Sequence, residues 1–159
     1  MNQQVARFQS GVIDELLGTG ALQKVHPNRT QADAFLTEAR THLMSARVVH
    51  ETGTDAIGAF GLTYEAARKA MAAVLINQGL RAPGGEGGHR SLGRALGDQL
   101  RAAHFPTADF DWMRRKRNSG AYGSESEAPP AAADVADGLQ VAEQIIGIAG
   151  QVLDVMMPY

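Results

Sequence analysis

The residues best suited to chemistry lie together between Trp112 and Tyr122. This stretch, WMRRKRNSGAY, holds four consecutive cations, one asparagine and two aromatic residues. Guanidinium groups bind phosphate through paired hydrogen bonds and stack on bases, so these residue types suit an RNA backbone or a nucleotide. The simpler alternative is a solvated basic helix end, where cations favour the helix dipole and Gly120 stops the helix.

The spacing of this stretch brings its functional groups to a common side of a helix. Arg114 and Arg117 are three residues apart, and Arg117 and Tyr122 are five apart, so all three can share one broad face. A second candidate is His89, which follows the glycine-rich segment 82–88 at a loop-to-helix position where function is often found. Its alternative role is to cap the helix. A phosphate-binding loop normally follows a β-strand, and no strand is predicted before these glycines.

Three further residues could support the basic stretch from a neighbouring helix. Glu65 and Arg68 are spaced i, i+3, which usually indicates only a surface ion pair. If that face packs against the basic helix, Tyr64, Glu65 and Arg68 could orient Arg117. The five histidines lack the close spacings of helical metal sites, and there is no cysteine, so thiolate catalysis and disulfides are excluded and no metal or cofactor is expected.

The elements that must position these residues are predicted to be helices. Apolar residues recur at steps of three or four, Thr30 and Thr54 are expected N-caps, and no alternating strand pattern occurs. The expected helices cover about 10–23, 30–51, 55–78, a segment after His89, the basic stretch from Thr107, and 134–157. We therefore predict an all-α, up-and-down bundle of about five to six helices forming one domain over 1–159, with a flexible N-terminus over 1–9 and a loop over 123–133.

Composition narrows the functional classes. With 44% hydrophobic and 20% charged residues, the chain has the composition of an ordinary globular protein. The formal net charge of −2 argues against broad attraction to nucleic acid, so any such contact must come from a local patch. No apolar run has the length of a signal peptide core or a membrane span, so we expect a soluble, cytoplasmic protein without a membrane partner.

Several of these features together resemble the HEPN superfamily of small helical-bundle proteins. The resemblance is carried by the order of long amphipathic helices, the stretch YEAARKA that begins at Tyr64, the turn before His89, and the late motif RRKRN that leads to Tyr122. It covers about residues 10–157. The late motif is most similar to an actinobacterial-type HEPN branch with the pattern Arg-Arg-x-Arg-Asn-x-x-x-Tyr.

This resemblance implies a two-fold homodimer with the motifs near the dimer interface. Many members are metal-independent RNases of toxin–antitoxin or antiviral systems, often paired with a nucleotidyltransferase-type antitoxin. Their active motif is an Arg, four to six residues, then a His. Arg117 and Asn118 match it, but Tyr122 occupies the His position, and a phenol with a pKa near 10 is a poor base at neutral pH. His89 or His104 could take that place from elsewhere in the bundle.

Three functions follow as expectations. The first is an RNA- or nucleotide-binding protein of a toxin–antitoxin or defence setting, with a degenerate catalytic motif. The second is an active metal-independent RNase toxin that uses Arg117 and Tyr122 or a distant His. The third is a structural or partner-binding bundle in which Arg117 and Asn118 bond across the fold. The expected substrate-binding residues are Arg114, Arg115, Arg117, Asn118, Tyr122 and His89.

Overall fold

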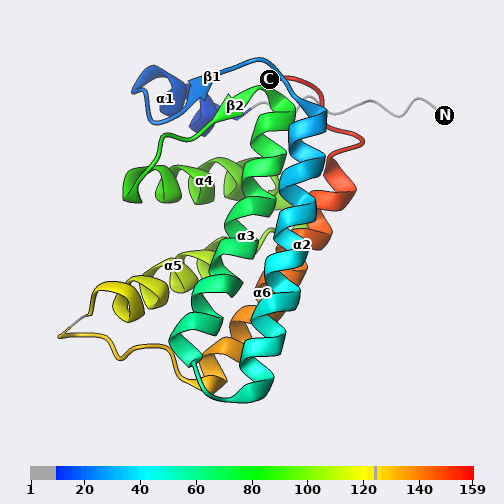
Figure 1. The fold of residues 1–159 in the computed structure, drawn as a ribbon. Helices are drawn as coiled ribbons and strands as arrows, with labels where there is room; N and C mark the ends of the chain where they lie inside the picture. The colour runs from blue at the N-terminus through cyan, green and yellow to red at the C-terminus, as the bar shows by residue number, and fades with distance from the viewer. Residues whose placement is uncertain (1–9, 124) are drawn as a thin grey trace.

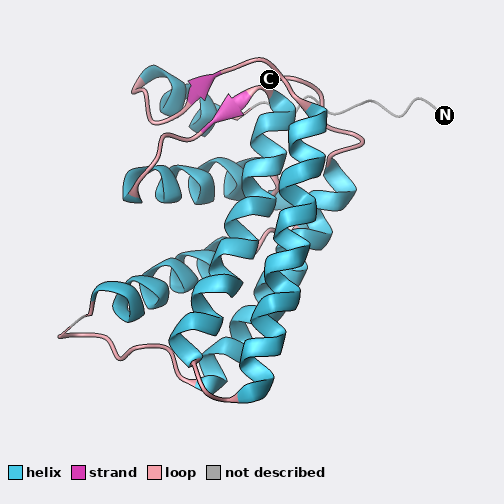
Figure 2. Ribbon diagram, viewed as in Figure 1, coloured by secondary structure: helices cyan, strands magenta, loops and turns pink. Residues whose placement is uncertain are grey.

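The computed structural model describes residues 10–123 and 125–159, and their fold is almost entirely helical (Figures 1 and 2). Residues 1–9, expected to be a flexible N-terminus, lie outside this described part. The elements within it are α1 (Gly11–Gly18), β1 (Gln23–Lys24), α2 (Arg29–Thr52), α3 (Ala56–Gln78), β2 (Leu80–Arg81), α4 (Glu86–Gln99), the 3-10 helix η1 (Arg101–Ala103), α5 (Thr107–Tyr122) and α6 (Ala132–Val152).

The long helices end where the sequence supplies the right residues. Gly53 and Gly79 adopt left-handed conformations at the C-termini of α2 and α3, at φ 66° and 81°. The N-termini are capped by Asn28 and Asp55, whose side chains accept backbone N–H groups of the first turn. The expected caps Thr30 and Thr54 are therefore wrong. The cap of α2 lies two residues earlier, at Asn28, and the cap of α3 lies one residue later, at Asp55.

Helix α3 is the central element of the bundle. It packs lengthwise against α2 and α6, and α4 and α5 contact it from one side (Figure 1). Helix α2 runs antiparallel to α3, because only the short turn around Gly53 joins them, whereas α6 runs in the same direction as α3. The buried face of α3 consists of small residues and a few large ones, including Phe60, Tyr64 and Met71. This arrangement confirms the all-α bundle predicted from helical periodicity.

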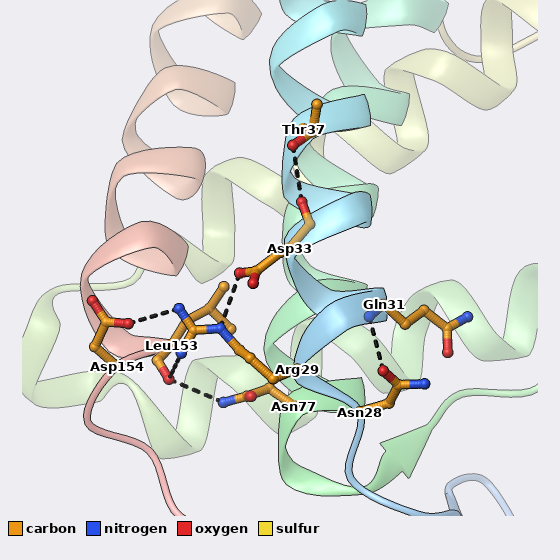
Figure 3. A network of polar contacts seen from close by, with 8 residues as sticks. All are labelled: Asn28, Arg29, Gln31, Asp33, Thr37, Asn77, Leu153 and Asp154. Carbon is orange, nitrogen blue, oxygen red and sulfur yellow. Dashed lines mark hydrogen bonds and ion pairs between the residues drawn. The ribbon is translucent and has the colours of Figure 1, made fainter.

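A polar network fastens the start of α2 to the end of α6 (Figure 3). The Arg29 guanidinium donates to the Leu153 carbonyl at 2.8 Å and to the carboxylates of Asp154 and Asp33 at 2.6 and 2.9 Å. Asn77 of α3 donates to the same Leu153 carbonyl at 3.2 Å. Three helix ends thus meet at one carbonyl group, which fixes the end of the bundle farthest from the basic stretch.

The side of α3 that carries α4 and α5 contains two departures from the sequence-based expectation. Strands β1 and β2 form a two-residue antiparallel pair, Gln23 with Arg81 and Lys24 with Leu80, where no strand was predicted. Helix α4 already begins at Glu86, so the glycine-rich loop is shorter than expected. Helix α6 begins at Ala132, two residues before the start expected from the sequence. In the described part of the chain, no helix combines the length and apolar character needed to cross a bilayer.

Candidate functional site

The four consecutive cations of α5 have different environments. Arg114 is only 8% exposed and donates to Asp111 Oδ1 at 2.9 and 3.2 Å, and these bonds lower the pKa of Asp111. Lys116 Nζ donates to the Ala128 carbonyl at 3.1 Å and lies 3.8 Å from Asp134, so it holds the loop that precedes α6. Arg115 and Arg117 line the same open cavity.

Arg117 is bordered by aromatic rings. Its Cζ lies 5.8 Å from the ring centroid of Tyr64 and 5.7 Å from that of Tyr122, both within cation–π range. Its Nη1 also donates to Asn118 Oδ1 at 3.3 Å. Among the described residues no carboxylate forms an ion pair with Arg117, so its charge is available to an anionic ligand.

Tyr64 forms the buried base of this arrangement. Its side chain is fully buried, and its ring stacks on Phe110 with centroids 5.5 Å apart and an interplanar angle of 16°. Its hydroxyl is hydrogen-bonded to Nδ1 of His89 at 2.9 Å. Helix α3 therefore positions both the guanidinium of Arg117 from α5 and the imidazole of His89 from α4.

These residues surround one open cavity of about 680 Å³, which we call the Arg117 cavity. This volume lies within the range of small-molecule sites, about 300–1,000 Å³. The predicted binding residues that line it are His89, Arg115, Arg117, Asn118 and Tyr122, joined by Glu127 from the following loop. Arg114, also predicted to bind substrate, instead lines a neighbouring hollow of about 340 Å³ that shares His89.

The predicted supporting residues divide into two groups. Tyr64 contacts Arg117, whereas Glu65 and Arg68 pair with each other, Arg68 Nε donating to the two carboxylate oxygens at 3.0 and 3.1 Å. Burial alone would raise the pKa of Glu65, but the hydrogen bonds and charge of Arg68 outweigh it, so that pKa lies below its ordinary value. Arg68 lines a different cavity, together with Lys69 and Arg81.

Gly120 does not stop α5, contrary to the expectation from sequence. The helix continues to Tyr122 and ends at Gly123, where φ is 76°. A Cβ on Gly120 would lie 2.9 Å from Cδ of Pro130, so this glycine allows the loop to pack closely on the helix. The extra turn carries Tyr122, 77% exposed, to the edge of the Arg117 cavity.

Of the two histidines considered as substitutes for the motif His, only His89 reaches the Arg117 cavity. His104 is exposed and has a left-handed backbone, at φ 57°, and its carbonyl accepts a hydrogen bond from Gln144. The contact between Tyr64 and His89 was not foreseen, because the two residues are 25 positions apart and no local spacing links them. Within the described chain, no group of three or more metal-ligating side chains is placed to hold an ion.

Comparison of the chain with known protein families, curated proteins and solved structures finds no match.

Proposed function

We propose that this protein binds RNA or a nucleotide in the Arg117 cavity. The proposal rests mainly on Arg117, which has two aromatic neighbours and, among the described residues, no acidic partner. It lines the same cavity as Arg115, Asn118 and Tyr122. Guanidinium groups bind phosphate oxygens, and an exposed tyrosine ring offers a face on which a base can stack.

The wider setting is proposed from the resemblance to the HEPN superfamily. In that setting the protein is a cytoplasmic homodimer of a toxin–antitoxin or defence system, and its partner is a nucleotidyltransferase-type antitoxin. Sedimentation of the purified protein at tens of micromolar tests the dimer, and a monomer would contradict it.

The binding proposal is tested with single-stranded RNA at a series of salt concentrations. Arg117→Ala is expected to weaken binding about tenfold or more, because hydrogen bonds to charged groups contribute about 1.5–3 kcal/mol. It should also reduce the slope of log affinity against log salt by about 0.7, the value for one phosphate contact to a single strand. The matched control is Arg101→Ala, since Arg101 is 82% exposed and lies outside the cavity. An equal loss of RNA affinity in Arg117→Ala and Arg101→Ala would contradict a specific site at the Arg117 cavity.

A second candidate function, metal-independent RNA cleavage, is favoured by the position of His89. His89 lines the Arg117 cavity, and histidine is the side chain that most often serves as a general acid or base. In such a reaction His89 would take the proton of the ribose 2′-hydroxyl as its oxygen attacks phosphorus. The bond to the 5′-oxygen of the next nucleotide would break, and this oxygen would take a proton from water to leave as a 5′-hydroxyl. The other product would be a 2′,3′-cyclic phosphate, and Arg117 would stabilise the charge on the phosphate.

Incubation of mixed RNA with the protein in EDTA separates cleavage from binding. Cleavage by wild type that falls about 10²-fold or more in His89→Ala, the usual contribution of an acid–base group, would support the second candidate. Tyr122→Phe should then retain activity. If wild type retains RNA without cutting it, the first proposal stands alone.

The architectural alternative has its own signature in stability. A buried ion pair broken by Arg117→Ala would lower the free energy of unfolding by about 3–5 kcal/mol. Arg117 is only partly buried, and its contacts are two rings and an amide, so we expect a smaller loss of about 1–2 kcal/mol, or about 0.5–1 kcal/mol for each cation–π contact. A urea titration distinguishes the two values, and a loss near 3 kcal/mol would favour architecture.

A further inference from the structure

A second cavity, of about 340 Å³, lies between α2, α3, α4 and the short strand β2, and we call it the hairpin cavity. Its walls include the buried side chains of Leu75, Leu80 and Leu92 together with Ala72 and the partly buried ring of Phe35. An apolar hollow of this size is at the lower end of the volumes that small-molecule sites occupy, about 300–1,000 Å³.

The charged residues that line the hairpin cavity all have the same sign. Arg68, Lys69 and Arg81 contribute to the lining, and among the described residues no aspartate or glutamate does. Lys69 is 22% exposed and is held over the ring of Phe35, at 4.8 Å from the centroid. Its acidic partner, Glu38, is half exposed and lies outside the lining. The cavity therefore combines an apolar wall with a basic one.

Arg81 is the cation in this set best placed to receive an anion. Its Nη2 donates to the side-chain oxygen of Gln23 at 2.9 Å, a neutral partner from the opposing strand. Within the described chain no carboxylate pairs with Arg81, whereas Arg68 and Lys69 are each paired with a glutamate. The β1–β2 pairing, with Arg81 opposite Gln23, fixes the backbone that carries this guanidinium.

From these observations we infer that the hairpin cavity is a binding site for a small organic anion with an apolar body, its acidic head on Arg81 and Lys69 and its body against Leu75 and Leu92. The site is separate from the Arg117 cavity, although His89 lines both. The inference does not depend on the proposed RNA binding, because it uses neither Arg117 nor Tyr122.

The test uses two fluorescent probes with nearly the same apolar body. Anilinonaphthalene sulfonate carries an acidic head, and N-phenyl-1-naphthylamine is its neutral counterpart. The sulfonate should bind saturably and about tenfold more tightly than the neutral probe, which corresponds to ~1.4 kcal/mol. Equal affinities, or no saturable signal from the sulfonate up to about 1 mM, the weak limit of specific binding, would overturn the inference.

Variants locate the probe. Arg81→Gln should weaken sulfonate binding about tenfold while leaving the neutral probe unchanged, and Ala72→Trp, which fills the cavity, should abolish both. Arg101→Gln is the control of equal charge change, and its affinity for the sulfonate should stay within about twofold of wild type because Arg101 does not line the hairpin cavity. Circular dichroism melts show whether Ala72→Trp is folded, and Arg81→Gln decides the outcome if it is not. If Arg117→Gln loses sulfonate binding and Arg81→Gln retains it, the probe binds in the Arg117 cavity and the inference is overturned.

Discussion

Removing the Tyr64 hydroxyl tests the contact that joins α3 to α4 at the Arg117 cavity. The hydroxyl is hydrogen-bonded to Nδ1 of His89 at 2.9 Å, and the side chain of Tyr64 is fully buried. Tyr64→Phe keeps the ring, so its stacking on Phe110 at 5.5 Å should persist. The loss of this hydrogen bond is expected to lower the free energy of unfolding by about 0.5–1.5 kcal/mol. In a chain of this size, each kcal/mol of lost stability lowers Tm by about 2–4 °C.

A double-mutant cycle isolates the bond from the packing that each side chain also contributes. Urea unfolding of wild type, Tyr64→Phe, His89→Ala and the double variant gives the coupling energy between the two residues, expected to be about 1 kcal/mol. A coupling energy below about 0.3 kcal/mol, the usual error of additivity, would refute the bond. Tyr122→Phe is the matched control. Because Tyr122 is 77% exposed, the same deletion there should change stability by less than about 0.5 kcal/mol.

Two further predictions concern the elements around the site. Gly88→Ala should lower the free energy of unfolding by about 1–3 kcal/mol, because its Cβ would lie 1.7 Å from the carbonyl oxygen of Pro83. Gly84→Ala is the control, since Gly84 has open space around it and the substitution should hardly change stability. Equal thermal melts of the two variants would contradict the contact between Gly88 and Pro83. The second prediction is a pH dependence at Glu65. Since Arg68 lowers the pKa of Glu65 in the folded state, the carboxylate stabilises the fold above its unfolded pKa of about 4.3, and this stabilisation is lost as the pH falls through the folded value. Wild type should therefore exceed Glu65→Gln in stability at neutral pH, with the difference shrinking in acid, and a difference that does not change with pH would contradict it.

The helices could be predicted because short-range patterns in the sequence determine where each one begins and ends. Apolar residues at helical spacing and the glycines at positions 53 and 79 define α2 and α3 almost to the residue. The β1–β2 pair could not be predicted, since two residues are too few to show an alternating pattern. The early start of α4 could not be predicted either, because its first turn contains Gly87 and Gly88 and glycine has a low helix propensity.

The candidate site was predictable to the extent that it lies on one helix. The proximity of Arg117 and Tyr122 follows from their spacing on α5, and the structure places both at one cavity. The different environments of Arg114 and Lys116 could not be predicted, because Lys116 bonds to a carbonyl in the next loop and the burial of Arg114 depends on how α4 packs beside α5. The role of Tyr64 as the base of the site likewise depends on contacts between distant segments.

The two rings beside Arg117 differ in a way that bears on its function. Tyr64 is fully buried and stacked on Phe110, so it cannot move without disturbing the core, whereas Tyr122 is 77% exposed on the last residue of α5. A ligand can displace or stack on the outer ring at little cost in packing, while the inner ring keeps the guanidinium in place. By contrast, Arg29, which holds the start of α2 to the end of α6, donates to two carboxylates and one carbonyl group. Arg117 is fixed on one side and accessible on the other, and this asymmetry is why we favour ligand binding over architecture.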